Sequence, residues 1–242
     1  MKLLFRYWSL VLPALIIGCT KIDNSTGSAS LTVVNGINGN STVLTNFQPL
    51  GPKGTFESPL QYYAKANRIR YGASWESGSY VRQVSLSLFA YPDTTTIRWQ
   101  GALNLQKGGI YTLFLGGDTT SIDTLLSLDQ IPYYPVSDSV SGIRIVNMVA
   151  GSQPVAINLA NVTANPDFAN LGYRQISGFK QYDVSSTGPG TYSFEVRDQA
   201  SDSVLATFDW SYTIFKNNTF VIIGSEKPDG SQPIQVVSIN NF

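Results

Sequence analysis

Short runs of β-forming residues, separated by turn residues, fill most of the chain. Residues 192–196 (YSFEV) alternate apolar and polar side chains, which is typical of a strand with one buried face. Residues 110–115 (IYTLFL) and 219–223 (TFVII) are dense runs of β-forming residues, each preceded by a turn. No long helical period competes with these runs, although residues 61–71 leave room for a turn or two of helix. The pattern predicts an all-β protein.

Each half of the chain also contains a segment that reads as a β-hairpin. The predicted strand pairs are residues 84–90 with 96–100 and residues 192–197 with 204–210. Pro92 and Asp93 supply the turn of the first hairpin, and a polar segment supplies that of the second. Trp99 and Trp210 lie within these strand patterns, so we expect both indole rings in the core.

Residues 31–43 and 143–155 align without a gap, about 110 residues apart. Each reads as a strand that enters a glycine-containing turn. The identical positions are Val34, Asn35, Gly39 and Val43 in one copy and Val146, Asn147, Gly151 and Val155 in the other. Two such copies predict tandem β-sandwich domains over residues 31–135 and 141–242, with a turn-rich boundary between them.

The beginning of the chain has the layout of an export signal. Two basic residues precede an apolar run at 7–17, which is too short for a membrane span of about 20 residues. With Gly18 and Cys19, the segment resembles the bacterial lipoprotein cleavage box. That resemblance implies a signal peptide over residues 1–18 and acylation of Cys19. The alternative is an ordinary secretory signal with an incidental cysteine.

Residues 19–30 are small and polar, which predicts a flexible tether between the lipid and the first domain. Two or more acyl chains hold a protein stably on a bilayer, so the membrane is the first expected partner. Thr20 stands where an Asp would signal retention at the inner membrane. We therefore expect attachment to the outer membrane, on its periplasmic side or at the cell surface.

Composition narrows the chemistry that the chain can perform. Hydrophobic residues make up 43% and charged residues 13%, and 16 basic side chains balance 16 scattered acidic ones. This balance gives no electrostatic case for nucleic acid. The absence of histidine and the single cysteine remove a Ser-His-Asp triad, imidazole ligands and thiolate zinc clusters. We expect no metal, no cofactor and no enzymatic activity.

Three motifs resemble the bacterial domain-of-unknown-function family numbered 4397. They are residues 142–147 (GIRIVN), 108–116 (GGIYTLFLG) and 128–132 (LDQIP). The chain departs from the family pattern at Thr32, which replaces an Arg, and at Phe220 and Val221, which replace Tyr-Thr. The resemblance implies exported immunoglobulin-like or transthyretin-like sandwiches, often on lipoproteins, with no agreed activity. It supplies no catalytic residues.

Residues 62–80 hold the densest mixture of aromatic and polar side chains. Tyr71, Trp75 and Tyr80 are candidates for a platform that stacks on a sugar ring, with neighbouring polar groups bonding its hydroxyls. The alternative, which we favour, is that these rings cover the end of a sandwich or pack between the domains.

Asp followed by Ser or Thr recurs along the chain in a pattern similar to the O-glycan acceptor motif of exported Bacteroidota proteins. The candidate acceptors are Thr94, Thr119, Thr124, Ser139 and Ser203, all in expected loops. The alternative is turn chemistry, in which Asp bonds its own backbone. The same turn role is favoured for the acidic pairs Asp118 with Asp123, Asp198 with Asp202, and Glu57 with Glu76.

The leading functional hypothesis is a non-enzymatic envelope module that binds or scaffolds, accessory to glycan uptake or adhesion. Its expected partners are glycans or other envelope proteins. One alternative is a structural stalk or assembly subunit that pairs sheet edges with its neighbours. A carboxylate-based hydrolase is a further alternative, which we do not favour.

Overall fold

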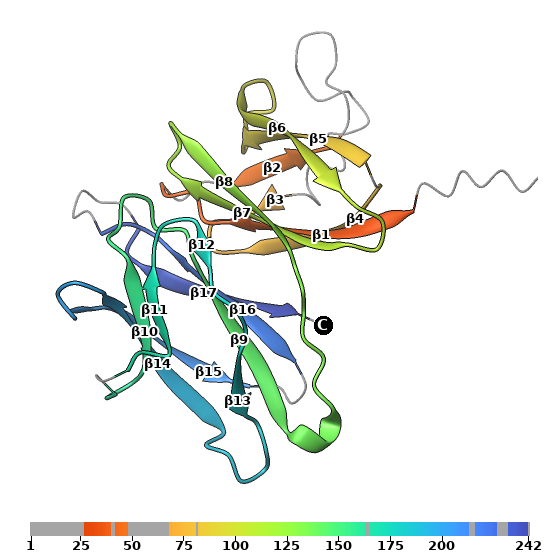
Figure 1. Ribbon diagram of the computed structural model, residues 1–242. Coiled ribbons are helices and arrows are strands. Elements are labelled where there is room, and N and C mark those ends of the chain that lie inside the picture. The colour runs from red at the N-terminus through yellow and green to blue at the C-terminus, as the bar shows by residue number, and fades with distance from the viewer. Residues whose placement is uncertain are drawn as a thin grey trace, which may run out of the picture.

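The computed structural model describes residues 27–39, 42–47, 68–80, 82–162, 165–212, 216–226 and 232–241, in which β-strands and one short 3-10 helix are found (Figure 1). The predicted all-β class is confirmed. The described strands form four sheets, and these pack in pairs as two sandwiches. The immunoglobulin-like or transthyretin-like type expected from the family resemblance stays a prediction.

The first domain is built from strands β1 to β8. One sheet contains β1 (Ser28–Asn35), β4 (Ser74–Tyr80), β7 (Ile110–Gly117) and β8 (Ile122–Leu128), in the order β4-β1-β7-β8. The other contains β2 (Val43–Asn46), β3 (Arg68–Ile69), β5 (Arg82–Ala90) and β6 (Ile97–Leu105), in the order β3-β2-β5-β6. β1 and β7 are parallel neighbours at the centre of the first sheet.

The second domain repeats this plan. One sheet contains β9 (Val140–Asn147), β12 (Gln175–Ile176), β16 (Asn217–Ile223) and β17 (Gln235–Asn241), in the order β12-β9-β16-β17, and β13 (Lys180–Asp183) also pairs with β9. The other contains β10 (Val155–Leu159), β11 (Phe168–Leu171), β14 (Thr191–Asp198) and β15 (Val204–Ser211), in the order β11-β10-β14-β15. β9 and β16 are again parallel central neighbours. The linker, residues 129–139, joins the domains and includes the 3-10 helix Val136–Asp138.

Most strands lie where the sequence pattern predicts them. β5 with β6 and β14 with β15 form the two expected hairpins. β1 differs, because it begins at Ser28 instead of after residue 30; its first residues pair with β4, and Ser30 N donates to Gly109 O at 3.0 Å. Residues 28–30 therefore belong to the first domain and not to the expected tether. The expected signal peptide, Cys19 and most of the segment 61–71 lie outside the described residues.

Each domain has its own apolar core between its two sheets. Core residues include Leu31, Val33, Leu86 and Leu113 in the first domain and Ile145, Ile157, Phe194 and Phe220 in the second. As predicted, Trp210 is buried in the second core, and Trp99 packs half-buried against the first.

A third cluster lies between the domains, where the sheet containing β1 and β7 faces the sheet containing β9 and β16. We call these two sheets the inner sheets. The interdomain cluster consists of Val34, Phe114, Val146, Met148, Val221, Ile223 and Ile239. Alternate residues of each central strand thus enter the domain's own core and the interdomain cluster. This double burial explains why β7 and β16 are buried along almost their whole length, and it stacks the sheets in four layers (Figure 1).

Asn35 and Asn147, which the sequence alignment makes equivalent, form the same buried turn. Each Oδ1 accepts from the backbone N–H two residues ahead, at 3.1 Å for Asn35 and 3.0 Å for Asn147. Each Nδ2 donates at 3.0 Å to a carbonyl, of Ile69 in the first domain and of Leu171 in the second. The identical contacts show that the two domains share a structural repeat.

Candidate functional site: the interdomain groove

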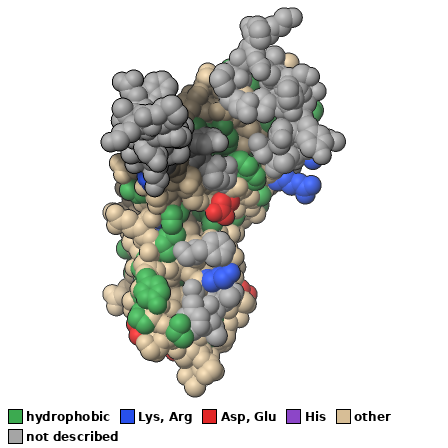
Figure 2. Space-filling model, turned by 90° about the vertical axis from the view of Figure 1, so that its right-hand side faces the viewer, with side chains coloured by type: hydrophobic (Ala, Val, Ile, Leu, Met, Phe, Trp, Pro, Cys, Tyr) green, Lys and Arg blue, Asp and Glu red, His purple; other side chains and the backbone are tan. Residues whose placement is uncertain are grey.

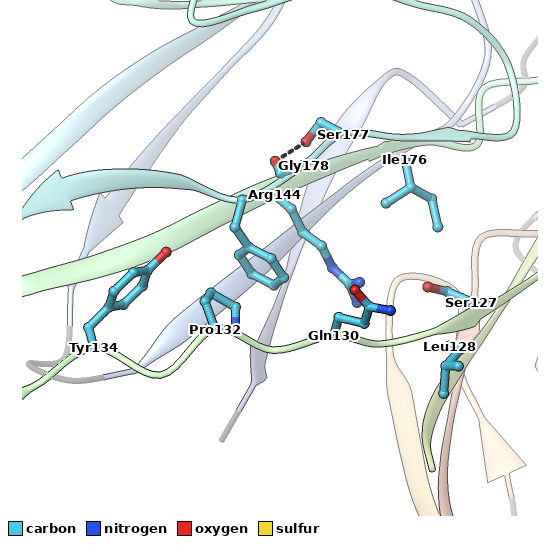
Figure 3. Close-up of a pocket in the computed structure, with 10 residues that line it drawn as sticks. Ser127, Leu128, Gln130, Pro132, Tyr134, Arg144, Ile176, Ser177 and Gly178 are labelled. Atoms are coloured by element: carbon cyan, nitrogen blue, oxygen red, sulfur yellow. Dashed lines mark hydrogen bonds between the residues drawn. The ribbon is translucent and has the colours of Figure 1, made fainter. Parts of the chain in front are cut away.

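A groove of about 450 Å³ with mixed polar and aromatic walls lies between the domains. One wall is the end of β8 and the start of the linker, with Gln130 and Tyr134; the other is the segment 176–179 after β12. Arg144 of β9 lies between the walls, and its guanidinium points toward the wall of Gln130 (Figure 3). The groove is therefore built from both domains and the linker.

Arg144 connects the two walls. Its Nη2 forms an ion pair with Asp129 Oδ1 at 2.8 Å, and the two side chains are only 5% and 1% exposed. Its Nε donates to Thr219 Oγ1 at 2.8 Å, and its guanidinium carbon lies 5.1 Å from the ring centroid of Phe179. Asp129 belongs to the linker wall and Phe179 to the opposite wall. One buried cation thus fixes both walls.

Two equivalent threonine hydrogen bonds hold Asp129 and the Thr219 hydroxyl that accepts from Arg144. Thr112 Oγ1 of β7 donates to Asp129 Oδ2 at 2.5 Å. Thr219 Oγ1 of β16 donates to Asn241 Oδ1 at 2.6 Å. The threonines occupy corresponding positions in the two parallel central strands, since Thr112 pairs with Thr32 and Thr219 with Arg144. The substitution of Thr32 by Arg144 in the second copy is therefore what places a cation at the domain boundary.

Asn217 holds the linker against β9. Its Oδ1 accepts from Gly142 N at 2.6 Å, and its Nδ2 donates to Pro132 O at 2.7 Å. A Cβ on Gly142 would lie 2.8 Å from that Oδ1 and 3.1 Å from Tyr134 Oη, so only glycine permits this approach. The linker wall is thus positioned by side-chain contacts to the second domain.

Some polar groups of the groove have no side-chain partner. The side chains of Ser127, Gln130 and Tyr134 make no hydrogen bond within the described ranges of the chain. Ser177, by contrast, is occupied: its Oγ accepts from Ile145 N at 2.8 Å and donates to Gly178 O at 2.9 Å (Figure 3). The linker wall therefore offers the hydrogen-bonding groups, and the opposite wall is internally satisfied.

A pair of equivalent tyrosines crosses the same boundary. Tyr173 Oη donates to Asp123 Oδ2 of β8 at 2.7 Å, and burial followed by this carboxylate raises the pKa of Tyr173. Tyr71 of the first domain packs against the interdomain cluster beside Val237, and burial raises its pKa as well. Both rings therefore belong to the domain interface.

The structure does not bring Tyr71 and Trp75 onto one surface. Tyr71 packs against the interdomain cluster, whereas Trp75 packs against the core of the first domain and stacks on Phe47 with centroids 6.1 Å apart. Tyr71 therefore packs between the domains, which is the alternative that the sequence analysis favoured, whereas Trp75 packs against a core instead. The side chain of Tyr80 lies outside the described part of the structure.

Two of the recurring Asp-Ser/Thr motifs, at Asp93 and Asp118, carry out turn chemistry, and so does Asp198 of an acidic pair. Asp93 Oδ1 accepts from Thr95 N at 2.7 Å, Asp118 Oδ1 from Thr120 N at 2.7 Å, and Asp198 Oδ1 from Ser201 N at 2.6 Å. Of the candidate acceptors, Thr94, Thr119 and Ser203 lie in turns or loops, and Ser139 follows the 3-10 helix with φ 50°. Thr124 departs from the expected loop location because it lies within β8.

The acidic side chains do not assemble into a site. Among the described residues, no three acidic or cysteine side chains gather as a metal site would require. Within the same ranges, no helix has the length and apolarity needed to span a bilayer. Charged side chains are scattered over the described part of the face in Figure 2 and form no continuous patch there. Glu57 lies outside the described residues.

The groove residues were not identified from the sequence. Arg144 and Gln130 belong to the family-like motifs 142–147 and 128–132, which indicate no binding role, and no sequence pattern distinguishes Tyr134 or Phe179. One usable signal was present: an Arg inside the apolar run IRIVN needs a buried partner, because an unpaired buried charge is costly. Its partner Asp129 is 15 residues earlier, at the start of the linker, and the sequence pattern cannot show that the two side chains meet.

Comparisons with known proteins found only distant structural similarity. No protein-family model and no curated protein matches it. Two solved structures align over most of its length. One concerns α-glucan recognition by family 41 carbohydrate-binding modules from streptococcal virulence factors, at 10% identity over 85% of this chain and 97% of that chain. The other concerns α-glucan binding by a streptococcal virulence factor, at 8% identity over 86% and 96%. Both have a TM-score of 0.25, so neither supports an argument about function.

Proposed function

We propose that this protein is a non-enzymatic envelope lipoprotein whose two β-sandwiches form one rigid binding module, with the interdomain groove as its binding site. The observation that carries the proposal is Arg144, which ties the linker wall through Asp129 and the opposite wall through Phe179. A groove whose walls are fixed before a ligand arrives binds at a lower entropic cost. Its volume lies within the range of roughly 300–1,000 Å³ common for small-molecule sites.

The envelope location rests on the export signal and on Cys19, together with the resemblance to the family numbered 4397. Mass spectrometry of the protein from its native host tests this part. We expect a mature chain that begins at an acylated Cys19. An unmodified thiol in a chain that keeps residues 1–18 would contradict the anchor.

A substitution that fills the groove tests the binding role without assuming a ligand. A Cβ at Gly178 meets no atom within 4 Å, and Gly178 lines the groove. Gly178→Trp should therefore fold normally and obstruct the site. Thr207→Trp, on the exposed face of β15, is the matched control.

The assay screens both variants and the wild type against envelope glycans, peptidoglycan fragments and peptides. We expect the wild type and Thr207→Trp to bind a component that Gly178→Trp no longer binds. Equal melting temperatures would show that the three proteins are folded alike. The proposal fails if the wild type binds nothing, or if Gly178→Trp binds as well as the control.

A further inference from the structure

We infer that the interdomain groove takes a neutral, hydroxyl-rich ring ligand, namely a sugar residue of a neutral glycan. This inference rests on the proposed binding role of the groove and adds the chemical class of the ligand. It follows from the charge balance of the groove, from its unpartnered polar groups and from its aromatic side chains.

The charge balance disfavours an ionic ligand. Arg144 is the only charged side chain that lines the groove among the described residues, and Asp129 neutralises it at 2.8 Å. An anionic ligand would have to compete with Asp129 for the guanidinium and would leave that carboxylate buried without its partner. A cationic ligand would meet Arg144 itself. A neutral ligand avoids both costs.

The groove side chains without a hydrogen-bond partner are suited to bind the hydroxyl groups of a ligand. Ser127 and Tyr134 each carry an O–H that both donates and accepts, and Gln130 offers an amide N–H₂ and a carbonyl. All three come from one wall, along residues 127–134 (Figure 3). Sugar hydroxyls also donate and accept, so each of these groups has a compatible partner on a sugar ring.

The aromatic side chains supply apolar surface beside these polar groups. Tyr134 and Phe179 both line the groove and converge on Gly142, where a Cβ would lie 3.1 Å from the Phe179 ring and 3.1 Å from Tyr134 Oη. The C–H face of a sugar ring packs on aromatic rings while its edge hydroxyls remain free to hydrogen-bond. The aromatic side chains of Tyr134 on the linker wall and Phe179 on the opposite wall therefore form a site for a thin, amphipathic sugar ring.

The test uses the full mature chain and an array of neutral oligosaccharides, oligosaccharides with uronic acid or sulfate groups, and peptides. The best binder is then titrated by calorimetry against Tyr134→Phe and Gln130→Ala. The matched controls are Tyr133→Phe, whose side chain is 85% exposed, and Gln153→Ala on an exposed loop. We expect neutral oligosaccharides to bind, each groove variant to lose about three- to tenfold in affinity, and the controls to lose none.

The outcomes separate this inference from the function on which it rests. Binding of a charged glycan or a peptide that Gly178→Trp abolishes would overturn the ligand class and leave the groove as a binding site. Neutral glycan binding that neither groove variant weakens would overturn the assignment to these residues. A wild-type protein that binds nothing on the array or in the wider envelope screen would overturn both.

Discussion

Tyr173 of the second domain donates a hydrogen bond to Asp123 of the first, at 2.7 Å across the domain boundary. Asp123 pairs with Gly116 at the end of β7, and the corresponding position in the second domain is Gln235, which pairs with Ile223. Tyr71, the counterpart of Tyr173, lies near Gln235 and packs against the interdomain cluster together with Val237 of the same strand. Each domain therefore contributes one tyrosine to the other domain's edge strand, so the two repeats are joined reciprocally.

This arrangement predicts a loss of stability at alkaline pH. Burial and Asp123 raise the pKa of Tyr173 above the ordinary tyrosine value near 10, so the folded state holds this proton more tightly than the unfolded chain. Its contribution is fully present below about pH 10 and is lost as the pH rises beyond it. Denaturant unfolding at several pH values should show a shallower decline above pH 10 for Tyr173→Phe than for the wild type. Equal slopes would contradict the linkage.

The buried ion pair predicts a large and non-additive mutational effect. Arg144→Met leaves the Asp129 carboxylate buried without its counter-ion, so we expect the free energy of unfolding to fall by about 3–5 kcal/mol. The double variant Asp129→Leu/Arg144→Met should lose less than the two single variants together. Lys180→Met, which breaks the exposed pair with Asp167, is the control and should cost less than about 1 kcal/mol. Additive effects in the double-mutant cycle would argue against coupling.

Two glycines at the domain interface should differ in their tolerance of a methyl group. A Cβ on Gly36 would lie 2.6 Å from Ile223 Cγ2 and 2.9 Å from the backbone oxygen of Leu115, so Gly36→Ala should cost about 1–3 kcal/mol. At Gly116 the nearest atom is Met148 Cε at 2.7 Å, the end of a flexible side chain that can move aside. Gly116→Ala should therefore cost less, by the same unfolding measurement. The reverse order would show that the interface adapts differently.

The repeated asparagines should be equally sensitive to an isosteric change. Asn35→Asp and Asn147→Asp remove the N–H that donates to Ile69 O or Leu171 O and bury a carboxylate near that carbonyl. We expect each change to cost about 2 kcal/mol or more, since a buried acceptor loses its donor. Asn104→Asp on the exposed side of β6 is the control. A large difference between the two domains would show that the turns are not equivalent in energy.

The sequence revealed local structure well and long-range packing poorly. Alternation and turn residues located the hairpins, and the Val-Asn match between residues 34–35 and 146–147 located the repeat. The polar start of β1 resembles a tether in sequence because Ser28 and Ser30 carry no apolar signal. Both residues are held by backbone pairing, which any residue can supply. The apolar runs 113–115 of β7 and 220–223 of β16 did contain the information that both faces are buried. What covers the second face is another domain, and nothing within a strand specifies that partner.

At the candidate site, too, the sequence predicts local structure but not long-range contacts. Each groove residue is ordinary in its own segment, and only the contact of Arg144 with Asp129 and Phe179 makes them a site. Tyr71 and Trp75 are close together in the sequence, which is the feature that predicts a shared platform. They are separated because Tyr71 lies in the turn before β4 and packs against the interdomain cluster, whereas Trp75 lies within β4 and packs against the core of the first domain.

The interdomain cluster has a consequence for how the molecule is made. Val34 and Phe114 belong to a domain that leaves the ribosome before β9 and β16 are available to cover them. A partly synthesised chain therefore exposes this hydrophobic surface until the remaining strands have been made. Maturation has to include a docking step between the finished halves, and the time before that step is when the chain is most exposed to self-association and to proteases.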